Sequence, residues 1–183
     1  HVVPQQHGRP VTVPLAAMDR RYGGEEANRH NVENQTEFGI MYGARGVEYL
    51  WIDAGWFEGG WPRGVGNFTP RKDGFPNGLR EVADNVKESQ GMGLVIWFEP
   101  ERVYEGTWLD REHPDWVIEL PNNATRLLNL GDPEALKWLT DTIADMIGRE
   151  GITVYRQDFN MEPLPYWKAT DEPDRVGMTE IRF

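Results

Sequence analysis

The feature that most constrains the fold of this chain is an alternation of short apolar segments with longer amphipathic ones. Apolar segments typical of strands occur at residues 11–17, 47–53, 93–98 and 152–158. Segments with helical periodicity lie among them, at about 32–45, 76–90 and 132–150. Strands that alternate with helices are typical of a parallel sheet covered by its crossover helices. The sequence therefore predicts an α/β fold of about four βα units in one domain, residues 1–183, whose pattern is weakest over residues 1–44.

Helix boundaries can be assigned from the residues that favour them. Pro76 is expected to open the second helix, and Asp132-Pro133-Glu134 has the acidic cap and first-turn proline of a helix start. Gly91 and Gly151 are expected to end these two helices. Within the connections, residues 125–130 are expected to form a short strand, and residues 171–183 are expected to begin a fourth helix.

Acidic residues at the ends of three predicted strands distinguish between α/β architectures. A doubly wound nucleotide fold would carry a glycine-rich phosphate turn after its first strand, and neither G-x-G-x-x-G nor G-x-x-x-x-G-K-[ST] occurs here. Asp53, Glu99 and Asp158 instead stand at the carboxyl ends of the strands. In a (β/α)8 barrel the carboxyl ends of the strands meet at the active site. The pattern favours such a barrel, although a strand-end acid can also simply cap the next helix.

Composition narrows the classes of partner. The formal net charge of −11 argues against nucleic acid, which needs clustered Lys and Arg. No apolar run approaches the roughly 20 residues of a membrane span. With no cysteine, disulfides and thiolate metal sites are excluded, and we expect a cytoplasmic protein that uses no cofactor or metal. Eight Trp residues provide either platforms for sugar rings or large core side chains.

The last predicted strand places a cation beside a carboxylate. Side chains alternate along a strand, so Arg156 and Asp158 share one face. A nearby cation lowers a carboxylate pKa and keeps the group ionised, as a glycosidase nucleophile requires. Asn160, just beyond the strand, can hydrogen-bond a sugar hydroxyl. The alternative is a purely structural ion pair.

Two further strand ends carry candidate sugar-binding groups. Trp97 and Glu99 share a face of the third predicted strand, which suits stacking on a ring and hydrogen bonds to its hydroxyls. Asp53 ends the second strand and either binds hydroxyls or caps a turn. Trp56, close behind it, is a candidate platform for a sugar ring.

Five motifs in order give these residues a family context, over roughly residues 45–183. The chain resembles the α-galactosidase (melibiase) catalytic domain of glycoside hydrolase family 36. The motifs are Trp51-Ile52-Asp53-Ala54-Gly55-Trp56-Phe57, Phe75-Pro76-Asn77-Gly78-Leu79, Trp97-Phe98-Glu99-Pro100-Glu101-Arg102-Val103, His113-Pro114-Asp115-Trp116 and Arg156-Gln157-Asp158-Phe159-Asn160.

The resemblance implies a retaining glycoside hydrolase of α-galactoside-like substrates. It makes Asp158 the nucleophile and Asn160 a substrate contact, and it places Trp97 and Glu99 in the motif that lines the sugar pocket. Arg156 stands where the family often has Lys. Asp53 matches the first of two adjacent acids that hold galactose hydroxyls. Ala54 stands in place of the second, which argues against strict α-galactoside specificity.

The family's acid/base lies on a later strand, beyond the residues present here. Four strands do not close a barrel, so the sequence predicts half a barrel, either part of a larger whole or completed by a homodimer. Glu101, Glu105, Asp110 and acids of the tail are the candidates for a second carboxyl within the chain. A catalytically weak or inactive half-barrel that binds sugar is the second hypothesis, and a metal enzyme built on the strand-end acids is the third.

Overall fold

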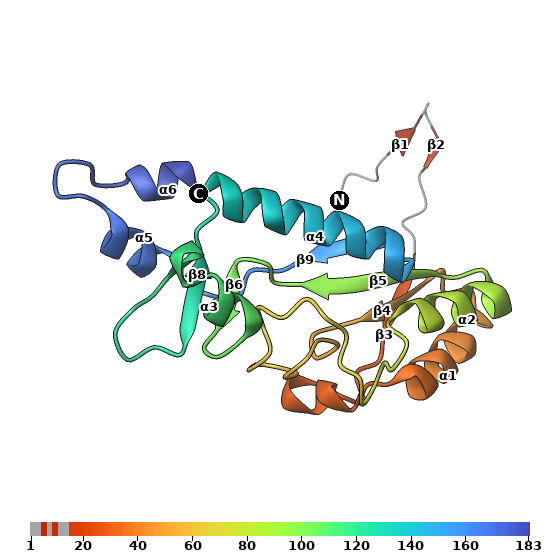
Figure 1. Ribbon diagram of the computed structural model, residues 1–183. Helices are drawn as coiled ribbons and strands as arrows, with labels where there is room; N and C mark the ends of the chain where they lie inside the picture. Colours follow the sequence, from red (N-terminus) through yellow and green to blue (C-terminus); the bar gives the residue numbers. More distant parts are fainter. Residues whose placement is uncertain (1–4, 7–8, 11–14) are drawn as a thin grey trace.

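A four-stranded parallel sheet forms the centre of the computed structural model, which describes residues 5–6, 9–10 and 15–183 (Figure 1). Its strands lie side by side in the order in which they occur along the chain, as in a section of a (β/α)8 barrel. All three strand pairs are parallel. The predicted set of four parallel strands is thus observed, although residues 11–14 of the first predicted strand lie outside the described part. The strands are β3 (Ala16–Met18), β4 (Tyr49–Ile52), β5 (Gly93–Phe98) and β9 (Val154–Gln157).

Three amphipathic helices connect these strands and pack on the sheet: α1 (Val32–Gly43), α2 (Arg80–Gln90) and α4 (Pro133–Glu150). Asp132 caps α4 as expected, since its carboxylate accepts the backbone N–H groups of residues 134 and 135. Gly91 and Gly151 end α2 and α4 in the left-handed conformation, with φ of 68° and 69°. These boundaries were predictable because each depends on a few adjacent residues.

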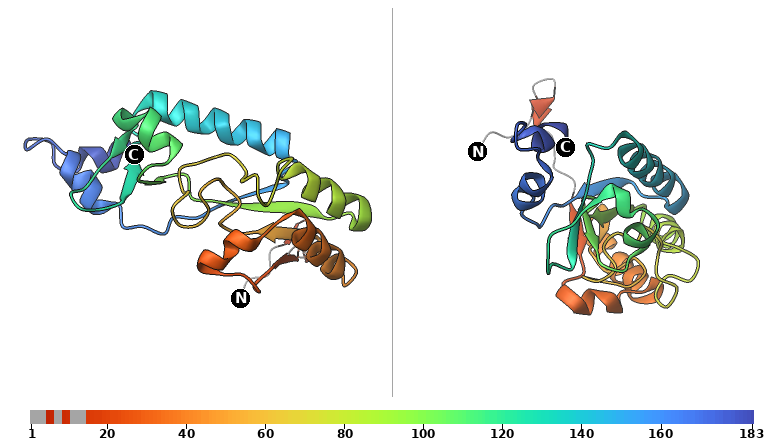
Figure 2. Two further views of the ribbon diagram at one scale, coloured as in Figure 1. Left: turned by 60° about the horizontal axis from the view of Figure 1, so that its bottom comes forward. Right: turned by 60° about the vertical axis from the view of Figure 1, so that its left-hand side comes forward.

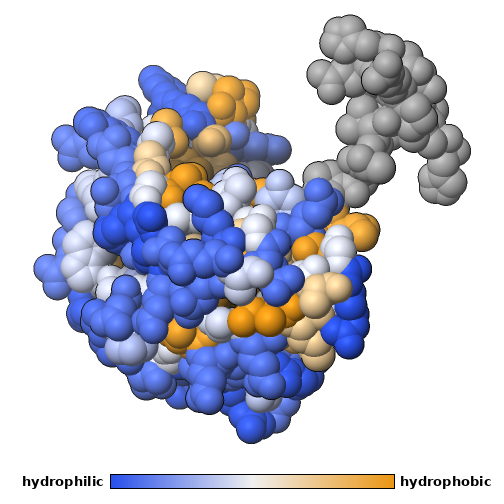
Figure 3. All heavy atoms as spheres, turned by 90° about the vertical axis from the view of Figure 1, so that its right-hand side faces the viewer, coloured by the Kyte–Doolittle hydropathy of each residue, from blue (hydrophilic) through white to orange (hydrophobic). Residues whose placement is uncertain are grey.

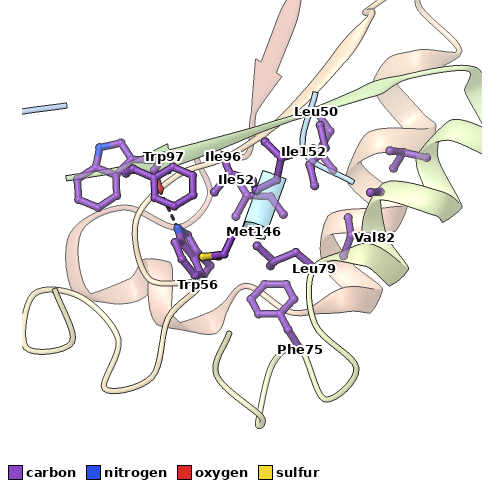
Figure 4. Close-up of a cluster of buried hydrophobic side chains, with 14 of the residues drawn as sticks. Leu50, Ile52, Trp56, Phe75, Leu79, Val82, Ile96, Trp97, Met146 and Ile152 are labelled. Carbon is purple, nitrogen blue, oxygen red and sulfur yellow. Dashed lines mark hydrogen bonds between the residues drawn. The ribbon is translucent and has the colours of Figure 1, made fainter. Parts of the chain in front are cut away.

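The main core lies between the sheet and the helices (Figure 4). Leu50, Ile52 and Ile96 point from the sheet toward Val82 of α2 and Met146 of α4. These five side chains are at most 1% exposed. The helices cover this face of the sheet, so the side chains on it are apolar. The polar residues of the strands lie at their carboxyl ends.

The start of α2 differs from the prediction. Pro76 lies in a turn, and the helix begins at Arg80. Gly78 has a φ of +85°, which a right-handed helix does not accommodate. The buried carboxylate of Glu150, from the end of α4, accepts the backbone N–H groups of Leu79 and Arg80 at 2.7 and 3.2 Å. A contact across 70 residues of sequence therefore sets this boundary.

The connection after β5 contains a small antiparallel sheet. The predicted strand near residues 125–130 is β8 (Thr125–Leu128). It pairs with β6 (Arg102–Tyr104) and β7 (Val117–Ile118), in the order β6-β8-β7. Between β6 and β7 lie α3 (Trp108–Glu112) and the 3-10 helix η2 (Pro114–Trp116).

The remaining elements lie at the two ends of the chain. A short antiparallel pair, β1 (Gln5–Gln6) and β2 (Arg9–Pro10), precedes the main sheet, and the 3-10 helix η1 (Gly24–Arg29) precedes α1. The tail forms α5 (Leu164–Thr170) and α6 (Met178–Arg182), which lie together at one end of the molecule (Figure 2). The predicted helix of the tail therefore appears only as the short α6.

The surface seen from the side of α1 and α2 is largely hydrophilic, with scattered apolar groups (Figure 3). Across the described residues, no helix has both the length and the apolar character that a membrane crossing requires.

Candidate active site

A cavity of about 500 Å³ opens where the strands of the main sheet end. It brings together four of the residues predicted from the sequence, namely Asp53, Trp97, Asp158 and Asn160. Two carboxylates, an amide and an indole thus face one space, as recognition of a polyhydroxylated ring requires. The rest of the wall comes mainly from the segment after β3 and from Ala54 and Trp61.

Asp158 follows β9 and is held by groups that favour its ionised form. Its Oδ2 lies 2.8 Å from the Arg156 guanidinium and accepts the indole N–H of Trp97 at 2.9 Å. Burial by itself raises the pKa of Asp158, but hydrogen bonds from Asn160, Trp97 and Arg156, with the charge of Arg156, outweigh it and lower the pKa to about 2. The predicted ion pair is confirmed, and Asp158 is a carboxylate at neutral pH.

Trp97 is held in position by a series of ring contacts. Its side chain is 3% exposed. The ring of Trp61 meets it edge to face, with centroids 5.5 Å apart, and the Arg102 guanidinium lies 4.5 Å from the centroid of the Trp61 ring. The indole of Trp97 is therefore fixed before any ligand binds, and its N–H points at Asp158.

Glu99 supports the site from behind the cavity wall. Its carboxylate accepts the backbone N–H of Asn160 at 2.6 Å and pairs with Arg102 at 2.5 Å. Burial raises the pKa of Glu99, and the Asn160 amide and Arg102 oppose that rise. The structure thus gives Glu99 contacts that position the segment carrying Asn160, and Glu99 does not line the cavity as a sugar ligand would.

Arg156 also lies outside the cavity wall. Its guanidinium pairs with Asp158 and lies 5.2 Å from the centroid of the Trp51 ring. Its observed contacts are with the nucleophile candidate and an aromatic ring.

The interpretation of Trp56 as a sugar platform needs correction. This side chain is 1% exposed in the main core, where its ring meets Phe57 and Phe98 edge to face. Its indole N–H donates to the carbonyl oxygen of Trp97 at 2.8 Å (Figure 4). Because the side chain is buried and its N–H is bound to a backbone carbonyl, Trp56 supports the strand beneath the site and is inaccessible to a ligand.

Asp53 faces the cavity from the end of β4, and its Oδ1 accepts the backbone N–H of Ala54 at 2.8 Å. The turn contact and the cavity position are compatible, because a carboxylate has acceptor capacity for several donors. Both readings of Asp53 from the sequence therefore have a structural counterpart.

Sequence reasoning missed the segment after β3. Asp19 is 1% exposed and accepts two N–H groups of Arg21 at 2.7 and 2.9 Å, with Gln35 at 3.3 Å. Burial raises the pKa of Asp19, but Arg21 outweighs it and lowers the pKa. The cavity-lining residues Arg20 and Tyr22 flank Arg21. The strand-end rule applied to Met18-Asp19 would have drawn attention to this segment.

The loop acids proposed as a second carboxyl lie elsewhere. Glu101 is buried and accepts a hydrogen bond from the Gln157 side chain. Glu105 and Asp110 pair with Arg126 of β8, at 3.9 and 2.7 Å. Within the described part of the chain, the carboxylates that line the cavity are those of Asp53 and Asp158. No group of three or more His, Cys, Asp or Glu in that part is arranged to hold a metal ion.

Fold and site together define a segment of a (β/α)8-type barrel with a carboxylate-lined cavity at its strand ends, and comparison with known proteins gives the family. The Melibiase family profile matches residues 27–174. The chain belongs to the melibiase family, as its motifs predicted.

Curated relatives include alpha-galactosidase C of Emericella nidulans, 30% identical over 176 residues, covering 84% of this chain and 23% of that protein. The alpha-galactosidase of Escherichia coli is 32% identical over 141 residues, covering 73% and 20%. Among solved structures, the GH36 alpha-galactosidase AgaA of Geobacillus stearothermophilus superposes with a TM-score of 0.80 at 24% identity, over 93% of this chain and 24% of that one. The chain therefore spans about a quarter of the length of these relatives.

Proposed function

We propose that this chain provides the nucleophile half of a retaining glycoside hydrolase site for α-galactosides, with Asp158 as the nucleophile. The observation that carries the proposal is the environment of Asp158, which faces the cavity at a strand end while Arg156 and Trp97 keep it ionised. The relatives named as α-galactosidases support the same reaction class.

In the proposed reaction an oxygen of Asp158 attacks the anomeric carbon of the sugar. The bond from that carbon to the leaving oxygen breaks, and its electron pair goes to the leaving group, which takes a proton from a second carboxyl. Water, which gives its proton back to the second carboxylate, then attacks the same carbon and releases the Asp158 carboxylate, so the configuration is retained overall. Such a mechanism needs the two carboxyls roughly 5–5.5 Å apart across the bond. The low pKa of Asp158 suits attack, because only the carboxylate is nucleophilic.

Substrate contacts in the proposal come from the cavity wall. Asp53 and Asn160 offer acceptors and donors to ring hydroxyls, and the partly exposed ring of Trp61 offers aromatic surface. Ala54 contributes only a methyl group beside Asp53. Since a missing hydrogen-bond partner reduces discrimination between hydroxylated ligands, we expect the site to distinguish galactosides from their epimers less sharply than a site with two acids.

The proton donor is proposed to come from outside the four strands described here. The strands β3 and β9 are the edges of the main sheet, and a two-fold dimer could pair these edges and bring eight strands to one barrel. Light scattering in dilute solution tests the dimer: a folded protein with the mass of a single chain would exclude it.

Covalent trapping tests the nucleophile separately from the proton donor. A fluorinated α-galactosyl fluoride needs no protonation of its leaving group, so a competent Asp158 should form a stable ester without a second carboxyl. Mass spectrometry should place the label on Asp158, and Asp158→Ala should remove it. Asp84→Ala, on the side of α2 that faces solvent, where the Asp84 side chain is 47% exposed, is the control and should label like the parent. A label on another residue, or equal labelling of Asp158→Ala, would refute the assignment.

The second candidate function is sugar binding without turnover, which the absence of further carboxylates from the described cavity wall favours. An assay with a nitrophenyl α-galactoside separates the two candidate functions. Saturable binding without release of nitrophenol supports a sugar-binding protein, and release of nitrophenol supports the enzyme.

A further inference from the structure

A second and larger cavity, of about 630 Å³, lies away from the strand ends, between the loop after β4, α3 and α4. It shares no lining residue with the cavity at Asp158. Its wall includes Asn67, Trp108, Arg111, Trp138, Asp141 and Arg149. The proposed hydrolysis uses none of these residues.

Two indoles, together with Phe68, make up the aromatic part of this cavity. Trp108 stacks on Trp138, with centroids 5.4 Å apart and an interplanar angle of 21°. Trp138 is held in turn by edge-to-face contact with Phe68 at 5.6 Å and by Trp116 at 5.9 Å. Trp108 nevertheless remains 39% exposed. A large apolar ring that is fixed by neighbours and still open to solvent is a ready surface for the face of a sugar.

The backbone around Trp108 is fixed as well. Its N–H donates to Oδ1 of Asn67 at 2.8 Å, while Nδ2 of Asn67 donates to the carbonyl oxygen of Glu58 at 2.8 Å. Little conformational freedom is therefore left to lose on binding, which favours affinity.

The polar groups around the indoles carry both signs of charge. Asp141, Asp145 and Glu58 are acidic, and Arg111 and Arg149 are basic. A ligand of one charge would meet a like charge here, whereas sugar hydroxyls both donate to carboxylates and accept from guanidinium groups.

We propose that this cavity is a second carbohydrate-binding site, which takes a neutral oligosaccharide against Trp108 and Trp138. The volume lies within the range of small-molecule sites, about 300–1,000 Å³. The inference is independent of hydrolysis at Asp158, since the two cavities share no residue.

Titration with raffinose, followed through the ¹⁵N indole signals of the tryptophans, tests the proposal. Trp108 and Trp138 should shift saturably with a Kd on the order of 1 mM, and Asp158→Ala should leave these shifts unchanged. The indole of Trp97 reports on the first cavity, so failure of the proposed function and failure of this inference are distinguishable.

Variants on the exposed face of α4 provide a matched pair. Asp141→Ala removes a cavity group, whereas Lys137→Ala removes only the exposed partner that pairs with Asp141 at 2.5 Å. We expect roughly tenfold weaker raffinose binding at Trp108 for Asp141→Ala and no change for Lys137→Ala. Trp108→Ala should abolish the shift at Trp138. The proposal would be overturned if the Trp108 and Trp138 signals stay unshifted at raffinose concentrations that saturate the shift of Trp97. Equal effects of the two α4 variants on raffinose binding would also overturn it.

Discussion

Replacing Glu99 by alanine should destabilise the protein strongly, because the largely buried guanidinium of Arg102 and the backbone N–H of Asn160 lose their acceptor. The carboxylate is 3% exposed and binds the backbone N–H of Asn160 and the guanidinium of Arg102. The Arg102 side chain is itself only 14% exposed. Glu99→Ala therefore leaves a largely buried cation without its partner.

The size of the effect follows from that arrangement. Removing one partner of a buried ion pair costs about 3–5 kcal/mol of unfolding free energy. Arg102 retains some solvent and a contact with the Trp61 ring, which moderates the loss. We expect Glu99→Ala to lower the free energy of unfolding by about 3 kcal/mol, the lower end of that range.

Glu99→Gln separates charge from shape, since an amide oxygen can still accept from Asn160. The raised pKa of Glu99 shows that burial disfavours its charged form, so we expect the Gln variant to stay within about 1 kcal/mol of the parent. Because the pKa of Glu99 is higher in the folded protein than in the unfolded chain, its contribution to stability is fully present at a pH below the unfolded-state pKa. That contribution is lost as the pH rises through the folded-state pKa. The stability difference should therefore shift in favour of Glu99→Gln as pH rises above about 4.5.

Urea unfolding followed by tryptophan fluorescence, from pH 4.5 to 8, measures both variants. Labelling of Asp158 by the fluorinated galactosyl fluoride adds a readout of the site, because Glu99 positions the segment that carries Asn160. Equal stability losses for Glu99→Ala and Glu99→Gln, or a difference that does not change with pH, would refute the reasoning.

Three further predictions concern single contacts. Trp97→Phe removes the N–H that binds Asp158, so the pKa of Asp158 should rise from about 2. On acidification, labelling of Asp158 should therefore begin to fall at a higher pH in the variant than in the parent. An unchanged pH profile would contradict this. Glu150→Ala removes the acceptor for two amides at the start of α2 and should cost about 2–3 kcal/mol in urea unfolding. Gly39→Ala brings a methyl group within 2.6 Å of a side chain of α2 and should lower the free energy of unfolding by about 1–3 kcal/mol in the same assay. Its control is Gly148→Ala, which has open space around it and should raise the free energy of unfolding by about 0.5–1 kcal/mol.

Local sequence was sufficient for the parts of this protein that depend on neighbouring residues. The Asp132 cap, the glycine helix ends and the ion pair between Arg156 and Asp158 each involve residues at most five apart, so local backbone geometry predicts them. The strand-end acids likewise follow from the alternation of strands and helices. The same local reasoning placed Asp53 and Asp158 at one site, because parallel strands end at one edge.

Tertiary structure decided what depends on contacts between distant segments. Trp56 and Trp97 look alike in sequence, yet of the two only Trp97 lines the cavity, because the side chain of Trp56 is buried in the core. The site around Asp158 and the role of Glu99 depend on contacts that span 61 residues. Strand and helix patterns fix which residues face a layer, but only packing fixes which of them solvent can reach. The sequence by itself thus determined the βα order and the nucleophile candidate, while the fold determined which side chains support it.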